Sequence, residues 1–140
     1  MIRVQLDQYA KTPTRAHDTD AGLDLYAPYG LDIHIRSGRA ATINTGVHIE
    51  IPEGYTGLIK SRSGLNIHQD IVCEGVIDAG YVGAVVVKLY NHSNELRCIK
   101  PGEKIAQIVI VPCLTEEVEV VDQICGGARG ENGFGSSGRF

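Results

Sequence analysis

Apolar and polar residues alternate along most of the chain in short stretches that turn signals separate. Alternation is clearest in three places: LDIHI at 31–35, VHIEI at 47–51 and EVEVV near Val118. In the first of these, Leu31, Ile33 and Ile35 would share one face of a strand, because successive side chains point to opposite faces. Two denser apolar runs, AVVVKLYN and IAQIVIVP, also favour strands, because they are rich in β-branched residues. Since no long window shows the 3.6-residue apolar period of a helix, the pattern predicts an all-β sandwich or barrel.

Length and charge narrow the possible functions. A chain of 140 residues is expected to form a single domain. The formal net charge of −4 argues against a broad surface for direct nucleic-acid binding, although a few local cations could still hold a small anion. We find neither a signal-peptide pattern nor an apolar run of about 20 residues. We therefore expect a soluble intracellular protein, cytoplasmic or nuclear, that does not bind membranes.

Cysteine and histidine spacing predicts no metal site. No two of the four cysteines stand at a CxxC spacing, so free thiols in a reducing compartment are expected. The five histidines also lack a ligand spacing. They are interpreted as surface or core residues without a metal-binding or catalytic role.

The C-terminal stretch differs from the rest of the chain. Residues 126–140 are rich in glycine and serine and contain Arg129 and Phe134, so they cannot pack a core of their own. Composition alone allows either a frayed terminus or a lid in which the arginine supplies charge and the phenylalanine supplies stacking. Composition favours the frayed terminus, and we divide the single domain into a strand-rich core at 1–125 and a C-terminal segment at 126–140.

Three stretches contain candidate groups for holding an anion or the cation that accompanies it. Arg62, Ser63 and Gly64 follow an apparent strand and could hold phosphate oxygens, although the same residues are common in turns. Gln107 lies inside an apolar run, where its amide needs partners, either a neighbouring backbone group or a phosphate or water. Asp24 lies between two leucines and belongs either to a solvated face or near a hydrated cation.

The stretch GVIDAGYVG, at 75–83, places one acid and one ring in an apolar run. Asp78 is a plausible general base for water if it is held within reach. Tyr81 could support a sugar, and the glycines on either side would let a flat ligand approach the backbone.

In chain order, AGLDLYA, SRSGL, GVIDAGYVG, GEKIAQ and RGENGFGSSG resemble the five motifs of trimeric dUTP pyrophosphatases, or dUTPases. The matches run from residue 21 to residue 138 in the order of the family. The resemblance implies a jelly-roll-like β-barrel and hydrolysis of dUTP to dUMP and pyrophosphate, with Mg²⁺ on the triphosphate. This activity limits uracil incorporation into DNA and supplies dUMP for thymidylate synthesis. The resemblance also implies a homotrimer whose active sites are shared. Asp78 would come from one subunit, and residues 126–140, as a mobile lid, would come from a different one.

The resemblance assigns roles around the scissile bond. Asp78 would hold and activate the attacking water and meet the 3′-hydroxyl. Tyr81 would pack under the deoxyribose, where a ribose 2′-hydroxyl would clash. Asp24 would reach Mg²⁺ through water, and Gln107 would contact phosphate or water. Phosphate binding would fall to Arg62, Ser63 and Gly64.

The resemblance also assigns the uracil reader and the lid. A hairpin from Gly75 to about Val86 would read uracil through main-chain groups, with Val76 and Ile77 among its residues. Arg129 would clamp the γ-phosphate, and Phe134 would close over uracil. The lid would be completed by Gly135, Ser136 and Ser137.

Two positions depart from the usual family pattern. Ser61 stands where proline is frequent, which would alter the loop slightly, and Asn132 replaces a frequent glycine in the lid.

Two rival functions remain. A dCTP deaminase shares the fold but needs groups that deaminate cytosine, and a regulatory protein could use the scaffold to sense nucleotide and bind a partner. The spacing of Asp78 and Tyr81 together with Phe134 favours the pyrophosphatase.

Overall fold

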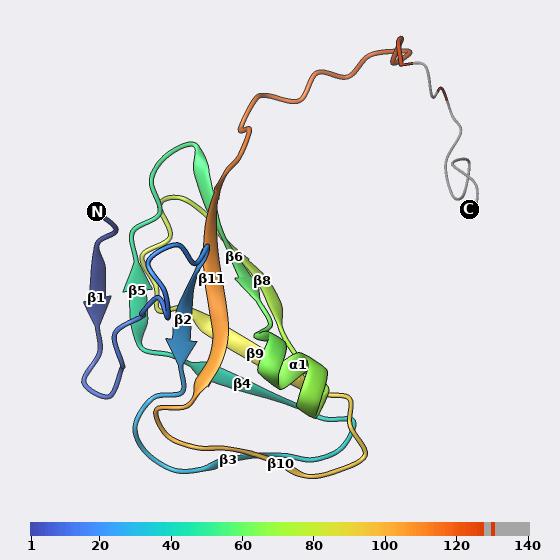
Figure 1. Ribbon diagram of the computed structural model, residues 1–140. Coiled ribbons are helices and arrows are strands. Elements are labelled where there is room, and N and C mark those ends of the chain that lie inside the picture. Colours follow the sequence, from blue (N-terminus) through green and yellow to red (C-terminus); the bar gives the residue numbers. More distant parts are fainter. Residues whose placement is uncertain (128–129, 131–140) are drawn as a thin grey trace.

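The computed structural model describes residues 1–127 and 130 and is built mainly of antiparallel strands (Figure 1). In chain order the elements are β1 (Val4–Leu6), β2 (Gly22–Tyr26), β3 (Ile33–Ile35), β4 (Ala40–Asn44), β5 (Val47–Ile49), β6 (Tyr55–Lys60), α1 (Ser63–Gln69), β7 (Ile71–Val72), β8 (Glu74–Ile77), β9 (Val86–Asn91), β10 (Arg97–Ile99) and β11 (Lys104–Pro112). The predicted all-β class is confirmed, and the arrangement fits a jelly-roll-like fold. Within the described residues, no helix is long and apolar enough to cross a membrane.

Among the described residues, the strands form four antiparallel sheets. The largest has the order β2-β11-β6-β8, the next has the order β4-β9-β7, and the pairs β1-β5 and β3-β10 complete the set. Strand β11 lies between β2 and β6, so it brings segments from distant parts of the chain side by side. The ladders of the described residues do not join these sheets into one closed barrel.

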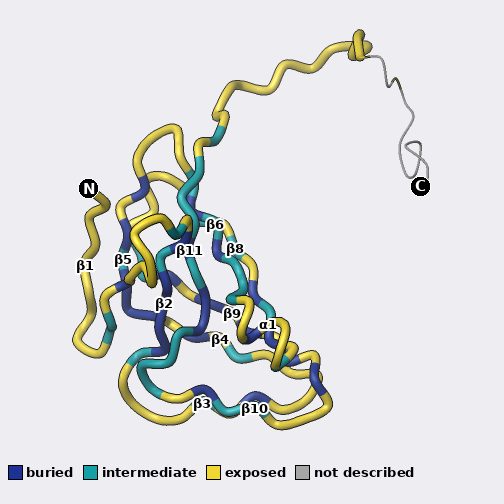
Figure 2. The backbone as a smooth tube through the Cα atoms, viewed as in Figure 1, coloured by how far each residue is buried: buried dark blue, intermediate teal, exposed yellow. Residues whose placement is uncertain are grey.

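One hydrophobic core lies between the sheets (Figure 2). Strand β9 shows how the pattern builds it, because every second residue is buried while the residues between them are exposed. Strand β11 crosses the centre, where Ala106 and Ile108 are fully buried. The alternation predicted for 47–51 is confirmed, since Val47, Ile49 and Ile51 are all buried.

Two details of the predicted strands were wrong. Leu31 is 89% exposed, because β3 begins only at Ile33 and the preceding residues form a bend. The stretch EVEVV forms no strand among the described residues, and Val118 is 93% exposed. A strand needs a neighbour for its main-chain hydrogen bonds. This part of the chain instead leads away from the sheets (Figure 1).

Helix α1 was not predicted from the sequence. It has seven residues, of which only Leu65 is buried, so it is too short to show an apolar period. It ends at Asp70, which adopts a left-handed conformation with φ of 53°. Two main-chain carbonyls of the last turn accept hydrogen bonds from the Asp70 amide.

Candidate functional site

A polar cleft of about 270 Å³ brings together several of the predicted phosphate-binding residues. Strand β2 supplies Asp24, the start of α1 supplies Arg62 as its N-cap and Ser63 as its first residue, and β11 supplies Gln107. They meet because β11 pairs with β2 on one side and with β6 on the other. The cleft is lined by Ala16, Asp20, Ala21, Gly22, Asp24, Arg62, Ser63 and Gln107. Gly64 lies just outside it, in the first turn of α1.

Asp24 is the buried acid of this cleft. It is only 7% exposed, which excludes the solvated-face interpretation. One carboxylate oxygen lies 2.9 Å from Arg62 Nε and the other lies 2.7 Å from Lys104 Nζ. A buried charge needs such partners, because removal from water is costly otherwise. The pairing holds the Arg62 guanidinium at the cleft, while its remaining N–H groups can donate to an anion.

Gln107 is fixed at the back of the cleft by the main chain. Its Nε2 donates a 3.1 Å hydrogen bond to the carbonyl of Ser61, as the structural interpretation predicted. Gly22 makes room for it, since a Cβ there would lie 2.3 Å from Gln107 Oε1. The amide oxygen therefore lies against the backbone of β2.

Ser61 is an anchor that the sequence did not predict. Its hydroxyl donates to the carbonyl of Cys73 at 3.0 Å and accepts from the Cys73 amide at 2.8 Å. These two bonds extend the β6–β8 ladder beyond Lys60, its last residue on β6. The serine thus replaces the rigidity of a proline with side-chain bonds, and it fixes the residue just before Arg62.

Replacing Ser61 with alanine should destabilise the chain by about 1–3 kcal/mol, because the partly buried Cys73 amide loses its partner. The substrate KM should also rise, because Arg62 follows directly. Ser37→Ala is the matched control, since it deletes one hydroxyl bond to the Ser93 carbonyl away from the cleft. Urea unfolding and steady-state kinetics would measure both effects. An unchanged KM in Ser61→Ala would show that Ser61 does not position the predicted phosphate-binding residues.

Asp78 and Tyr81 form a tight turn directly after β8. The amide of Tyr81 donates to the carbonyl of Asp78 at 3.2 Å, and Gly80 has a φ of 83°. The Tyr81 hydroxyl donates to the carbonyl of Ala84 at 3.1 Å. A Cβ on Gly83 would lie 2.3 Å from that hydroxyl. Glycine at this position therefore lets the Tyr81 ring fold back over its own loop, and the Asp78 carboxylate stays exposed.

A second cleft, of about 490 Å³, is lined in part by Tyr81 and Val82 of this turn. His48 holds the loop there. Its Nδ1 lies 2.7 Å from the carbonyl of Val82, and its Nε2 lies 3.3 Å from an oxygen of Asp7. Both partners are acceptors, so only the imidazolium, with a proton on each nitrogen, satisfies both. The Val82 carbonyl, and to a lesser degree Asp7, accordingly raises the pKa of His48 above its ordinary 6.5.

The raised pKa of His48 predicts that the stability of the fold depends on pH. Because its pKa is raised in the folded chain, its contribution is fully present below about pH 6.5 and is lost as the pH rises through the folded-state pKa. The melting temperature of the wild type should exceed that of His48→Gln at about pH 6, and the difference should shrink by about pH 8. His92→Gln serves as a control outside both clefts. A difference that is constant across this range would show that the imidazolium does not hold the loop.

Asp78 and Arg62 lie far apart within one chain. In the ladder between β6 and β8, Lys60 pairs with Glu74 while Gly57 pairs with Ile77. Arg62 therefore follows one end of β6, and Asp78 lies beside the other end. Six residues of strand at about 3.3 Å each separate them by roughly 20 Å. An arginine side chain cannot span this distance.

The predicted uracil-reading hairpin needs a correction. Strand β8 pairs with β6, whereas β9 pairs with β4 and β7, so Gly75–Val86 links two sheets and is not a paired hairpin. Within it, Val76 and Val86 are 61% and 46% exposed, and Ile77 is half-buried. Thr56 donates to the Ile77 carbonyl at 3.1 Å.

The remaining predicted residues lie outside the described part of the chain. They are Arg129, Asn132, Phe134, Gly135, Ser136 and Ser137.

Sequence reasoning had not found Lys104 or His48. Lys104 follows directly after the PGE turn and could have been suspected from its position, but its partner Asp24 is distant in the sequence. All four cysteines are free, as predicted.

Comparisons with known proteins agree with these motifs. The family model for dUTPase matches residues 8–138. A deoxyuridine 5′-triphosphate nucleotidohydrolase of Clostridium tetani is 40% identical and covers 96% of this chain and 93% of its own length. The enzyme of that name from Escherichia phage T5 is 36% identical over 99% of both chains.

Solved structures of the same kind share the fold. The dUTPase of Staphylococcus bacteriophage 80alpha, with dUPNHPP, superposes with a TM-score of 0.91 at 34% identity over 99% of this chain and 98% of its own. A mutant dUTPase from phage phi11 of S. aureus, described with a structural Mg(II) ion, gives 0.82 at 31% identity over 89% of this chain and 98% of its own. The chain belongs to the dUTPase family.

Proposed function

We propose that this chain hydrolyses dUTP at an active site assembled from more than one subunit of a homotrimer. The reaction is that of a dUTP diphosphatase, in which dUTP and water give dUMP and pyrophosphate. The assignment of single residues and the sharing of the site are the new parts of this proposal. One observation carries them: the phosphate cleft and Asp78 lie at opposite ends of β6.

A trimer resolves this separation. Cyclic assembly of identical chains repeats one heterologous contact, and it can place the Asp78 end of one chain against the Arg62 cleft of the next. The segment after Cys113 supports such an assembly. Leu114, Val120 and Ile124 are each at least 84% exposed, although their side chains are apolar. A neighbouring subunit would bury them and would provide the partner strand that EVEVV lacks.

Asp78 acts as the general base in this proposal. Its carboxylate follows β8 and is exposed, so it can hold a water and accept a proton from it. The water oxygen attacks the phosphorus of the α-phosphate, and the bond from that phosphorus to the bridging oxygen breaks. Pyrophosphate then leaves. The 3′-hydroxyl of the sugar also contacts Asp78, which orients the substrate relative to the water.

Arg62, Ser63, Gly64 and Gln107 hold the phosphate chain in this proposal. The guanidinium is already held in place by Asp24, so little conformational freedom is lost when an anion binds. The positive charge is local, which is why a chain with a net charge of −4 can bind a triphosphate.

Mg²⁺ fits the cleft as an ion held mainly by the triphosphate. It prefers oxygen ligands and keeps several of its waters. Both oxygens of Asp24 already face cations, so this carboxylate suits an outer position, reached through water, better than direct coordination. When bound, the ion neutralises phosphate charge and polarises the phosphoryl group.

The loop from Gly75 to Val86 reads the nucleoside in this proposal. Strand β8 lies at the edge of its sheet, so main-chain groups around Val76 that do not bond to β6 can donate to and accept from the uracil edge. Tyr81 supports the deoxyribose from below and leaves no space for a 2′-hydroxyl. Arg129 then clamps the γ-phosphate, and Phe134, followed by Gly135, Ser136 and Ser137, closes over the base and excludes water.

Substrate discrimination tests these assignments. Wild-type protein with Mg²⁺ should release pyrophosphate from dUTP and release no ammonia from dCTP, which a deaminase would do. In Tyr81→Ala, kcat/KM for UTP relative to dUTP should rise by roughly 10-fold or more, because a steric block of the order of 1–3 kcal/mol is removed. Tyr55→Ala, a tyrosine at the other end of β6 from Arg62 and outside both clefts, should leave the ratio unchanged. An unchanged ratio in Tyr81→Ala would place sugar selection elsewhere, while pyrophosphate release from dUTP tests the reaction separately.

A further inference from the structure

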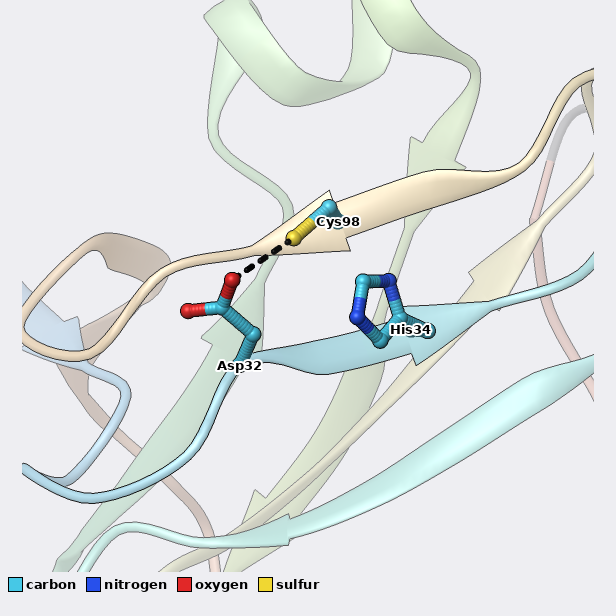
Figure 3. Close-up of side chains that lie close together, drawn as sticks. All are labelled: Asp32, His34 and Cys98. Atoms are coloured by element: carbon cyan, nitrogen blue, oxygen red, sulfur yellow. Dashed lines mark hydrogen bonds between the residues drawn. The ribbon is translucent and has the colours of Figure 1, made fainter.

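The outer face of the small β3-β10 sheet holds a cluster that the sequence did not predict. In this sheet Cys98 lies directly opposite His34. Ile35 and Ile99 point from the same strands into the core, so His34 and Cys98 point outward. Asp32 precedes His34 by two residues and therefore shares its face. Figure 3 shows the three side chains on this one face.

The spacing of the three groups suits a metal ion. One ligand atom from each of Asp32, His34 and Cys98 lies within 4.8 Å of the other two. Cys98 Sγ and Asp32 Oδ2 are 3.6 Å apart. For tetrahedral zinc, Zn–S and Zn–O bonds of about 2.3 and 2.1 Å place sulfur and oxygen roughly 3.6 Å apart. This pair is thus already at the separation that coordination requires, and a His34 ring nitrogen lies within 4.8 Å of both atoms.

We propose that Asp32, His34 and Cys98 bind one divalent transition-metal ion of the zinc class, with a water as fourth ligand. A thiolate and an imidazole select such ions over Mg²⁺, which prefers oxygen. The Cys98 thiol releases its proton to solvent as the Sγ–metal bond forms. Because His34 lies in β3, Asp32 directly precedes that strand and Cys98 lies in β10, the ion cross-links the two strands. The site differs in place and ligand chemistry from the triphosphate cleft around Asp24.

Lys100 is the competitor for this site. Its ammonium forms an ion pair with Asp32 Oδ2, the same oxygen that faces Cys98. The lysine side chain is 63% exposed, and exposed ion pairs contribute little to stability. The ammonium can therefore move into solvent when a metal binds. Removal of its charge in Lys100→Gln should tighten metal binding by roughly two- to fivefold.

Cobalt titration of the full chain, without nucleotide and with a non-thiol reductant, tests the proposal. Wild-type protein should bind one Co²⁺ per chain and develop a thiolate-to-cobalt charge-transfer band. Zn²⁺ should abolish the band, whereas excess Mg²⁺ should leave it intact. Cys98→Ser should remove the band, and His34→Ala and Asp32→Asn should each weaken binding by at least about 10-fold. Cys113→Ser and Cys125→Ser are matched thiol controls and should retain it.

Thermal unfolding with zinc tests the same site without relying on the cobalt absorption band. Zinc should raise the melting temperature of the wild type, because a ligand that binds only the folded chain stabilises it, and it should not do so for Cys98→Ser. The side chains face solvent, so circular dichroism of the variants should match that of the wild type. No cobalt band in the wild type, or a band that survives in Cys98→Ser or disappears in Cys113→Ser, would overturn the proposal.

Discussion

Asp78→Asn should lose about 10²–10⁴-fold in kcat for dUTP, because asparagine keeps the shape of the side chain but cannot accept the proton of the attacking water. The amide can still donate to or accept from the 3′-hydroxyl. Binding of a non-hydrolysable dUTP analogue should therefore stay within roughly threefold of wild type, a difference below about 1 kcal/mol. Steady-state kinetics measures kcat, and calorimetric titration with the analogue measures the binding affinity separately.

The control for this variant is Asp18→Asn. It removes another exposed carboxylate, one that lines neither cleft, so it should keep kcat and affinity near those of the wild type. The melting temperature of Asp78→Asn should also match wild type, because the Asp78 side chain is exposed. If Asp78→Asn hydrolyses dUTP at a near-normal rate, the general base is another group.

The strands of the core could be predicted because their pattern is local. Alternation in β5 places the buried residues correctly, since a period of two requires no knowledge of the partner strand, and the apolar run of β11 predicts its strand. EVEVV has the same pattern but forms no strand in one chain, because hydrogen-bond partners are not encoded locally. Helix α1 was missed because seven residues give too few turns to show a period.

The motifs identified the site residues, but the sequence could not show how they are held. Asp24 was left between two interpretations because its partners Arg62 and Lys104 reach it only through the pairing of β11 with β2 on one side and with β6 on the other. The role of Ser61 depends on Cys73, which the β6–β8 register brings opposite it. His34 and Cys98 meet for the same reason, although their spacing in the sequence matches no metal motif.

The distance between Asp78 and Arg62 along β6 leads to the second large prediction. Asp78→Asn and Arg62→Gln should each be nearly inactive as pure proteins, the first without its base and the second without a phosphate-binding cation. Arg62→Gln should still fold, because Asp24 keeps its 2.7 Å contact with Lys104. Each variant carries an intact copy of what the other lacks. If neighbouring subunits supply the two residues, mixed trimers will contain some complete sites.

Co-refolding the two variants in equal amounts and measuring dUTP hydrolysis is the most direct test of the shared site. With random cyclic assembly, a site takes its Asp78 and its Arg62 from two different chains, each intact with a chance of one half. About a quarter of the sites should then recover wild-type activity. The variants refolded separately and mixed afterwards provide the baseline. Activity near a quarter of wild type is the predicted result, and activity that stays at the baseline would contradict the shared site, because a site built within one chain always keeps one of the two defects.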